Sequence, residues 1–133
     1  MKKARQRYSQ PAISEEMKAW STALANETAD WPHISQRSFF GFTALYRGDY
    51  IFDMLPRSRN IDTANKIAFK IDAQSTVLQK RISSDERIIP FEVSKKKNPA
   101  RWFTFLLSTD ADLHDALEWL STSYQATARR KKK

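Results

Sequence analysis

The stretch FFGFTALYRGDYIFDML, residues 39–55, constrains the fold of this chain more than any other. It holds two runs in which apolar and polar residues alternate, and both glycines of the chain, Gly41 and Gly48, interrupt it. Alternation with a period of two is typical of strands that bury one face, and glycine is typical of the turns between them. The stretch predicts strands over 34–40, 42–46 and 50–55, with a bulge or sharp turn at Gly41 and a turn at Arg47-Gly48-Asp49.

The flanking segments add helices and further strands. Ser14 precedes two glutamates and an apolar stripe through Met17, Trp20 and Leu24, which is the pattern of a capped amphipathic helix. Thr109 and Asp112 have the spacing of a capping box in front of another apolar stripe. We expect helices over 15–29, over 73–83 and from 109 onward, and in the second of these Val77 and Leu78 should face inward. We expect further strands over 66–71, 88–93 and 101–107. Pro90 should place the 88–93 strand at an edge of the sheet.

This order of elements predicts the fold class. Short links between the first three strands favour antiparallel pairing, and 133 residues suffice for one hydrophobic core. We therefore expect a single α+β domain with two layers: an antiparallel sheet of about five strands with helices on one face. The domain should span residues 14–128, between a flexible basic arm at 1–13 and a basic tail at 129–133.

The positive charge is concentrated at the two ends. The formal net charge is +8, but residues 1–7 carry +4 and residues 129–133 carry +5, which leaves the body near −1. Basic tails are usually flexible, and they attract nucleic acid in a salt-dependent way. The alternative is that they only keep the chain soluble.

Several classes of protein are disfavoured by composition. The chain has no cysteine, so it forms no disulfide and no thiolate site. No apolar run approaches the roughly 20 residues that span a bilayer, and the N-terminal stretch lacks the apolar core of a signal peptide. We therefore expect a soluble cytoplasmic protein with no membrane partner.

Five basic residues of the predicted sheet and its loops are candidates for binding an anion or nucleic acid. Arginine forks suit phosphate and carboxylate groups. The alternative is that they are surface charges paired with Asp49, Asp53 and Asp62. The candidates are Arg47, Arg57, Arg59, Lys70 and Arg101.

The aromatic residues alternate with polar neighbours, which predicts that they pack in the core. An exposed remainder, Tyr46 or Trp102, would line a groove in which bases could stack. The set comprises Trp20, Trp31, Phe39, Phe40, Phe42, Tyr46, Phe52, Phe69, Trp102 and Phe103.

Catalytic and metal signals are weak. His114 lies four residues after Asp110, which is most simply a pair on a helix surface, and no nucleophile of suitable spacing accompanies it. The two histidines and scattered carboxylates show no metal-ligand spacing, and two glycines exclude a glycine-rich phosphate loop. We expect no catalytic residue, no metal and no cofactor.

Two parts of the chain resemble known families. FFGFTALYRGDYIFDML followed by KIAFKI resembles the hairpin and lysine-bearing strand of the TfoX N-terminal domain, which shares a small α/β fold with MmcQ/YjbR-like proteins. RWFTFLLSTDADLHDALEWLSTSY is similar to the end of the small "luciferase-like" domains. These likenesses cover about 34–71 and 101–124, and Phe39 stands where the first family usually has Met. The resemblance implies a regulator with a DNA-binding shape and implies no catalytic set.

Together these observations favour a non-enzymatic binding or regulatory module that binds nucleic acid or a protein partner weakly. The alternative is a pocket for a small anionic metabolite, built from Arg57, Arg59, Lys70 and Arg101.

Overall fold

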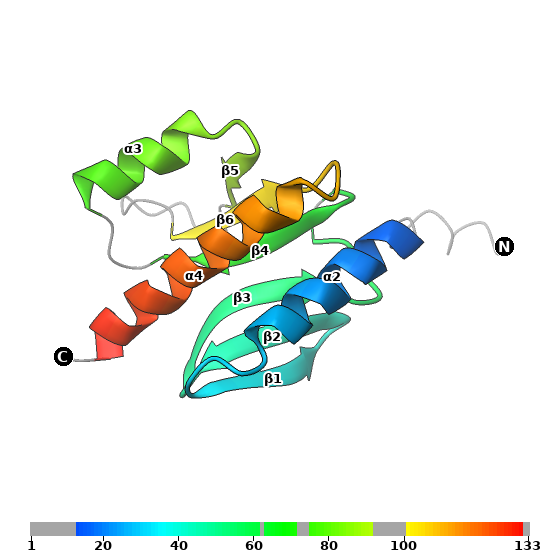
Figure 1. Cartoon of the computed structure of the whole chain (residues 1–133), viewed down its shortest axis with the longest axis horizontal. Coiled ribbons are helices and arrows are strands. Elements are labelled where there is room, and N and C mark those ends of the chain that lie inside the picture. The colour runs from blue at the N-terminus through cyan, green and yellow to red at the C-terminus, as the bar shows by residue number, and fades with distance from the viewer. Residues whose placement is uncertain (1–12, 62, 72–74, 92–100, 132–133) are drawn as a thin grey trace, which may run out of the picture.

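The computed structural model describes residues 13–61, 63–71, 75–91 and 101–131. Within these ranges three helices and six strands form one two-layer unit (Figure 1). The helices are α2 (Glu15–Thr28), α3 (Thr76–Ser84) and α4 (Asp112–Lys131), and the strands are β1 (Ile34–Phe39), β2 (Phe42–Arg47), β3 (Tyr50–Pro56), β4 (Lys66–Lys70), β5 (Ile88–Pro90) and β6 (Trp102–Leu106).

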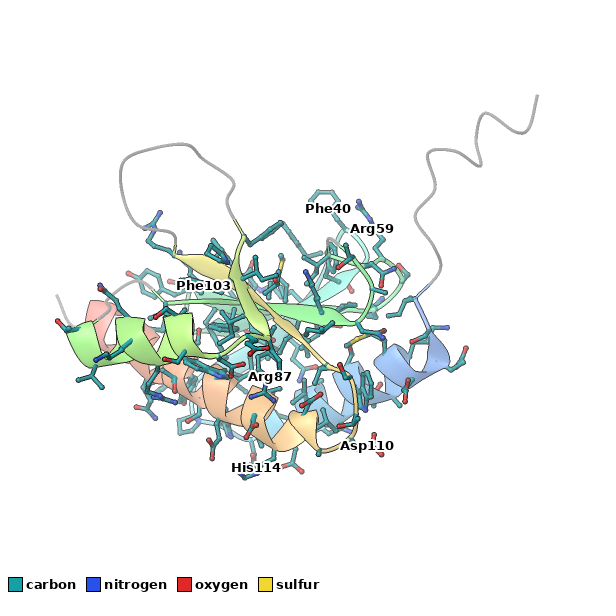
Figure 2. All side chains as sticks on the ribbon, turned by 90° about the horizontal axis from the view of Figure 1, so that it is seen from above. Phe40, Arg59, Arg87, Phe103, Asp110 and His114 are labelled. Carbon is teal, nitrogen blue, oxygen red and sulfur yellow. The ribbon has the colours of Figure 1, made fainter. Side chains whose placement is uncertain are left out.

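The strands form one antiparallel sheet in the order β1-β2-β3-β4-β6-β5. The helices lie on one side of this sheet, as the view from above shows (Figure 2). The predicted α+β fold class is therefore confirmed, with six strands because Ile88–Pro90 pairs with β6. Pro90 lies on the edge strand, as predicted; residues 92 and 93 of that expected strand are outside the described residues.

Two tight turns shape the first three strands. Phe39 pairs with Phe42, so the β1–β2 turn consists of Phe40 and Gly41, which have φ angles of 47° and 90°. A Cβ at Gly41 would lie 2.6 Å from the Arg59 side chain, so only glycine fits there without a shift. The β2–β3 turn uses Gly48 at φ 61°. The sharp turn expected at Gly41 and the turn at Gly48 are both confirmed.

The core lies between the sheet and α2 and α4. Met17, Trp20 and Leu24 face it from α2, and the Ser14 hydroxyl accepts a hydrogen bond from the Met17 amide at 3.0 Å, as the predicted cap requires. Ile13 is also buried, so the structure corrects the placement of this residue in the basic arm; the rest of that arm lies outside the described residues. The main apolar residues on the sheet and α4 are Leu45, Phe52, Phe69, Phe105, Ala116 and Leu120.

The helix predictions needed three corrections. Helix α4 begins at Asp112 rather than Thr109, because the Asp112 carboxylate accepts hydrogen bonds from the Ser108 and Thr109 amides ahead of the first turn. It continues to Lys131, into the segment assigned to the basic tail. Val77 is 70 % exposed, since the buried stripe of α3 runs through Leu78 and Ile82. Residues 73 and 74 of the predicted helix lie outside the described residues.

In the part of the chain that the structure describes, no helix is both long and apolar enough to span a bilayer.

Candidate functional site

The structure divides the five basic candidates between the two ends of the sheet. Arg57 and Arg59 follow the end of β3 next to the β1–β2 turn, because Pro56 pairs with Phe42. Lys70 lies towards the opposite end, since Asp53 pairs with Phe69 and the two strands are antiparallel. These residues therefore do not form one anion pocket.

Arg47 has a structural role on the helix side of the sheet. Its Nη1 donates to the carbonyl oxygen of Tyr124 at 3.1 Å, and its guanidinium carbon lies 4.0 Å from the centroid of that ring. This cation–π contact and hydrogen bond hold β2 to α4. Arg47 is therefore not available at a hairpin tip.

Tyr46, Lys70 and Trp102 lie on the sheet face that carries no helix. Strand alternation places Tyr46 on the same face as Ala44, and the Ala44–Met54–Ala68–Thr104 ladder continues that face to β6. Trp102 pairs with Lys70 there, and all three residues are only half-buried. Arg101 is exposed beside this group, and its carbonyl oxygen accepts from the Ile71 amide. Ala44, Ala68 and Thr104 of the ladder are buried, so on these strands the face is accessible mainly at Tyr46, Lys70 and Trp102.

The most distinctive surface feature is the end of the β1–β2 hairpin. We define the tip as Phe39, Phe40, Arg57 and Arg59. Phe40 is 74 % exposed and Phe39 is 40 % exposed, with their rings 4.8 Å apart in an edge-to-face arrangement. Figure 2 shows Phe40 and Arg59 together on the side of the molecule away from the helices. Two exposed phenylalanines beside two arginines are unusual for a purely structural turn.

The loop after β3 holds this tip in place. The amides of Arg57 and Ser58 donate to the Gly41 carbonyl oxygen at 3.0 and 2.9 Å. The Arg59 side chain donates to the Phe40 carbonyl oxygen at 3.3 Å, and Arg57 donates to the Ser38 hydroxyl at 3.3 Å. The turn and the loop are therefore one unit, although 16 residues separate Gly41 from Arg57 in sequence.

The charges of the tip are not neutralised within the described residues. Neither Arg57 nor Arg59 forms an ion pair with a described carboxylate. Asp53, which the sequence offered as a surface partner, is completely buried in β3, and Asp62 lies outside the described residues. Two guanidinium groups and two exposed rings can therefore meet a ligand that is both anionic and aromatic.

Sequence reasoning missed Phe39 and Phe40 as surface residues. It assigned both to the core with the other aromatic residues, whereas Trp20, Phe52, Phe69 and Phe103 are buried as predicted. The missed signal was their adjacency. Consecutive side chains of a strand point to opposite faces, and a residue directly before a turn glycine lies at the surface.

A second surface region lies between α3 and α4. It is a shallow cleft of about 810 Å³, and its lining mixes Lys80 and Arg81 with Asp115 and Glu118. Arg81 stacks over the ring of Trp119, with 4.8 Å between its guanidinium carbon and the ring centroid. The mixture of both signs of charge gives this cleft no clear preference for a ligand.

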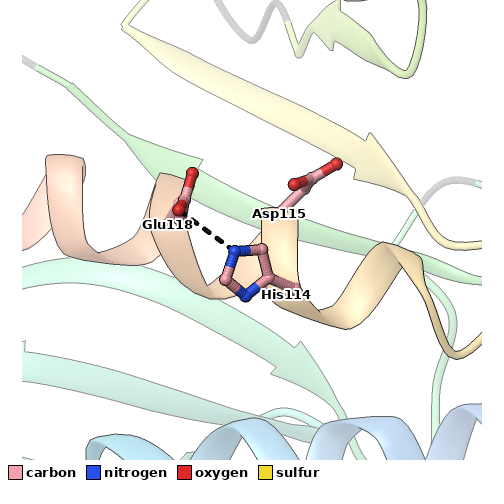
Figure 3. Close-up of side chains that lie close together, drawn as sticks. All are labelled: His114, Asp115 and Glu118. Atoms are coloured by element: carbon pink, nitrogen blue, oxygen red, sulfur yellow. Dashed lines mark ion pairs between the residues drawn. The ribbon is translucent and has the colours of Figure 1, made fainter.

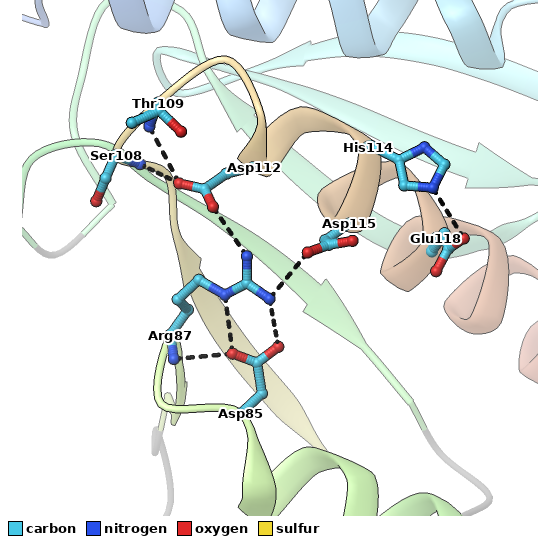
Figure 4. Close-up of polar contacts among 8 residues, drawn as sticks. All are labelled: Asp85, Arg87, Ser108, Thr109, Asp112, His114, Asp115 and Glu118. Atoms are coloured by element: carbon cyan, nitrogen blue, oxygen red, sulfur yellow. Dashed lines mark hydrogen bonds and ion pairs between the residues drawn. The ribbon is translucent and has the colours of Figure 1, made fainter.

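Arg87 holds three carboxylates together at the edge of that cleft (Figure 4). Its guanidinium nitrogens lie 2.9 Å from both Asp85 and Asp112, and 3.1 Å from Asp115. The hydrogen bond from Arg87 lowers the pKa of Asp85, and the Ser108 amide, followed by the other donors, lowers the pKa of Asp112. These charges satisfy one another and join the β5 segment to α4.

One cluster has donor atoms close enough for a metal ion, namely His114, Asp115 and Glu118 (Figure 3). His114 Nε2 lies 3.2 Å from Glu118 Oε2, so its partner is Glu118 and not the predicted Asp110. Asp110 instead accepts a hydrogen bond from the Trp20 indole at 2.8 Å. Because Arg87 already binds Asp115 and would repel a cation, the cluster is best described as a surface ion pair.

Comparison with known proteins adds no identification: no protein-family model, no curated protein and no solved structure matches the chain. The resemblance to TfoX, YjbR-like and "luciferase-like" domains therefore stays a prediction.

Proposed function

We propose that this chain is a non-enzymatic binding module that holds single-stranded nucleic acid at the tip. The observation that carries the proposal is the exposed Phe40 ring, 74 % accessible, lying beside Arg59 and the Phe39 ring. Unpaired bases stack on exposed aromatic rings, and guanidinium forks bind the phosphates between them. A duplex would hide its base faces, so single strands suit this surface better.

The charge distribution supports a nucleic-acid ligand. Residues 1–7 and 129–133 carry +9 together, on a body that is close to neutral. Such charges raise the local concentration of a polyanion and bind it without sequence preference. The tip would then supply the short-range contacts.

A binding role is also consistent with the side chains present. Among the described residues, the partner of the His114 imidazole is the Glu118 carboxylate, at 3.2 Å. An activated nucleophile needs such a base within hydrogen-bond reach.

The test is a fluorescence-anisotropy titration with short mixed-sequence single-stranded DNA and RNA. We expect Phe40→Ala to weaken binding by about tenfold, because one base–ring stack contributes about 1–3 kcal/mol. Arg59→Gln should weaken binding and also reduce its salt dependence. The Phe40 ring and the Arg59 side chain are both exposed, so neither change should unfold the protein.

Matched controls lie in the cleft between α3 and α4. Val77→Ala removes a comparably exposed apolar side chain, and Lys80→Gln removes one exposed charge. Both should leave affinity within twofold of the wild type. The proposal fails if Phe40→Ala and Val77→Ala have the same effect, or if the wild type binds no single strand at low salt.

A further inference from the structure

A small cleft opens beside the tip, between α2 and the ends of β2 and β3. Its volume is about 260 Å³, which is enough for a phosphate-sized group with some water. Four residues at helical spacing line it from α2, and three line it from the strands. They are Lys18, Ser21, Thr22 and Ala25 on the helix side and Thr43, Pro56 and Arg57 on the strand side.

The lining of this cleft favours an anion. Two of its residues, Lys18 and Arg57, are cations, and none is a carboxylic acid. Three others carry hydroxyl groups, which donate well to oxyanions. The cleft between α3 and α4 differs, because both acidic and basic side chains line it.

Ser21 supplies an independent observation. It is 7 % exposed, and its hydroxyl has no hydrogen-bond partner among the described residues. A buried serine or threonine within a helix commonly bonds a carbonyl oxygen one turn earlier, as Thr28 does with Leu24 at 3.0 Å. A buried polar group without a partner is costly, so its retention points to a partner that binds from outside.

Lys18 can turn into the cleft at little cost. Within the described part of the chain it forms an ion pair of 3.4 Å with Glu15, and its side chain is about half exposed while that of Glu15 is almost fully exposed. Exposed pairs of this kind contribute little to stability. Arg57 is similarly placed, because its hydrogen bond to the Ser38 hydroxyl joins it to a neutral group.

We propose that this cleft binds a phosphoryl group, with the Ser21 hydroxyl as the buried donor and Arg57 and Lys18 as the charged ones. The group belongs either to a free phosphorylated small molecule or to the backbone of a strand whose bases stack at the tip. Only the second source rests on the proposed function. Arg57 is common to the cleft and the tip, which makes the two sites contiguous.

The experiment is a ¹H–¹⁵N NMR titration of the full chain with inorganic phosphate, at constant ionic strength and with chloride as the reference. We expect saturable shifts of the amides of Ser21, Thr22 and Arg57. Ser21→Ala and Arg57→Gln should each weaken phosphate binding at least about fivefold, because each removes a donor to a charged group. Ser21→Ala should fold normally, since alanine is a better helix former and removes an unpaired hydroxyl.

Lys80→Gln is the matched control, because it removes one exposed charge on α3 and Lys80 does not line this cleft. It should leave phosphate affinity within twofold of the wild type. The proposal is overturned if the wild type shows no saturable shift at Ser21, or if Ser21→Ala binds phosphate as well as the wild type does.

A second arm identifies the source of the phosphoryl group. If phosphate competes with a single-stranded oligonucleotide and Ser21→Ala weakens both, the cleft binds backbone phosphate. If Ser21→Ala weakens phosphate binding alone, the cleft serves a free phosphorylated molecule. If Phe40→Ala binds a single strand as well as the wild type does, while the wild type still binds phosphate at Ser21, the proposed function is rejected and the phosphate site is supported.

Discussion

Asp53 is the least expected residue of this protein. It lies on β3 opposite Phe69, is fully buried, and neither carboxyl oxygen has a hydrogen-bond partner that meets normal geometry. Burial raises the pKa of Asp53 well above its usual range, and the Met54 amide only partly offsets this. The pairing of β2 with β3 shifts register between Leu45 and Tyr46, so Phe52, next to Asp53, has no partner on β2. The neutral, protonated form of the carboxyl group is therefore favoured.

This carboxyl group should make the protein less stable as the pH rises. Its pKa is about 3.9 in the unfolded chain and higher in the fold, so the folded state binds more protons above pH 4. The free energy of unfolding then falls with pH until the folded pKa is passed. Asp53→Asn removes this dependence. Urea unfolding at about pH 4 and pH 8 should show the variant gaining stability relative to the wild type as the pH rises, because the variant has no carboxyl group to ionise at this position.

The expectation is contradicted if the free energy of unfolding changes with pH in the same way for Asp53→Asn and for the wild type. Asp49→Asn is the matched control, because Asp49 is exposed in the β2–β3 turn. The same chemical change at this exposed site should leave the free energy of unfolding at about pH 7 within about 0.5 kcal/mol of the wild type.

Residue-level prediction from the sequence succeeded for side chains with local roles and failed for those with distant partners. Ser14 and Gly48 act within a few residues of themselves, and local pattern identified both. Arg47 has its partner 77 residues away on α4, and no local signal reveals that. The same holds for Arg57, whose place at the tip depends on where the loop after β3 folds back.

At the level of elements, β5 is the weakest part of the sheet. It has three residues and ends in Pro90, which lacks an amide donor. The segment before it is held by Arg87, which also accepts a backbone hydrogen bond from Leu106 at 3.0 Å. We therefore expect the Arg87 ion pairs to stabilise this edge of the sheet.

Arg87→Gln should lower the free energy of unfolding by about 1–3 kcal/mol, since it leaves three carboxylates without their shared partner. The loss should shrink at low pH. The pKa values of Asp85 and Asp112 are lowered in the fold, so their contribution is complete above about pH 4 and is lost as the pH falls through the folded values. Urea unfolding at about pH 7 and pH 2.5 measures both effects.

Lys18→Gln is the matched comparison, because it removes an exposed ion pair on α2. It should cost less than about 0.5 kcal/mol. An equal loss from both variants would show that the Arg87 network contributes no more than an ordinary surface pair.

The sequence predicted the type of every described element, and its errors lie at element ends and between elements. Alternation and turn glycines are local, so β1, β2 and β3 were placed within about two residues. The insertion of β6 between β4 and β5 depends on packing across the whole sheet. No spacing rule in the sequence encodes that order.

At the level of the whole molecule, the basic ends and the tip should contribute to single-strand affinity with different dependences on salt concentration. We consider a variant with the nine terminal cations changed to glutamine, which preserves the length of α4. Its affinity for single-stranded DNA should fall most at low salt, and the slope of log affinity against log salt should flatten. Fluorescence anisotropy at several salt concentrations measures this. The positions are Lys2, Lys3, Arg5, Arg7, Arg129, Arg130, Lys131, Lys132 and Lys133.

Phe40→Ala should behave in the opposite way. It removes stacking and no charge, so affinity should fall by a similar factor at every salt concentration. An unchanged slope in the glutamine variant would assign all the electrostatic attraction to the folded body.

The position of α4 at the end of the chain has a consequence for synthesis. The strands of the first meander are complete at Pro56, but Tyr124, which packs on Phe52, is made about 70 residues later. At about 5–20 residues per second, the ribosome needs roughly 3–14 s for that interval. During those seconds the apolar side of the nascent sheet lacks the part of its cover that α4 provides. The newly made chain should therefore depend most on chaperones when it is translated from an mRNA on which the ribosome slows between the codons for Pro56 and Tyr124.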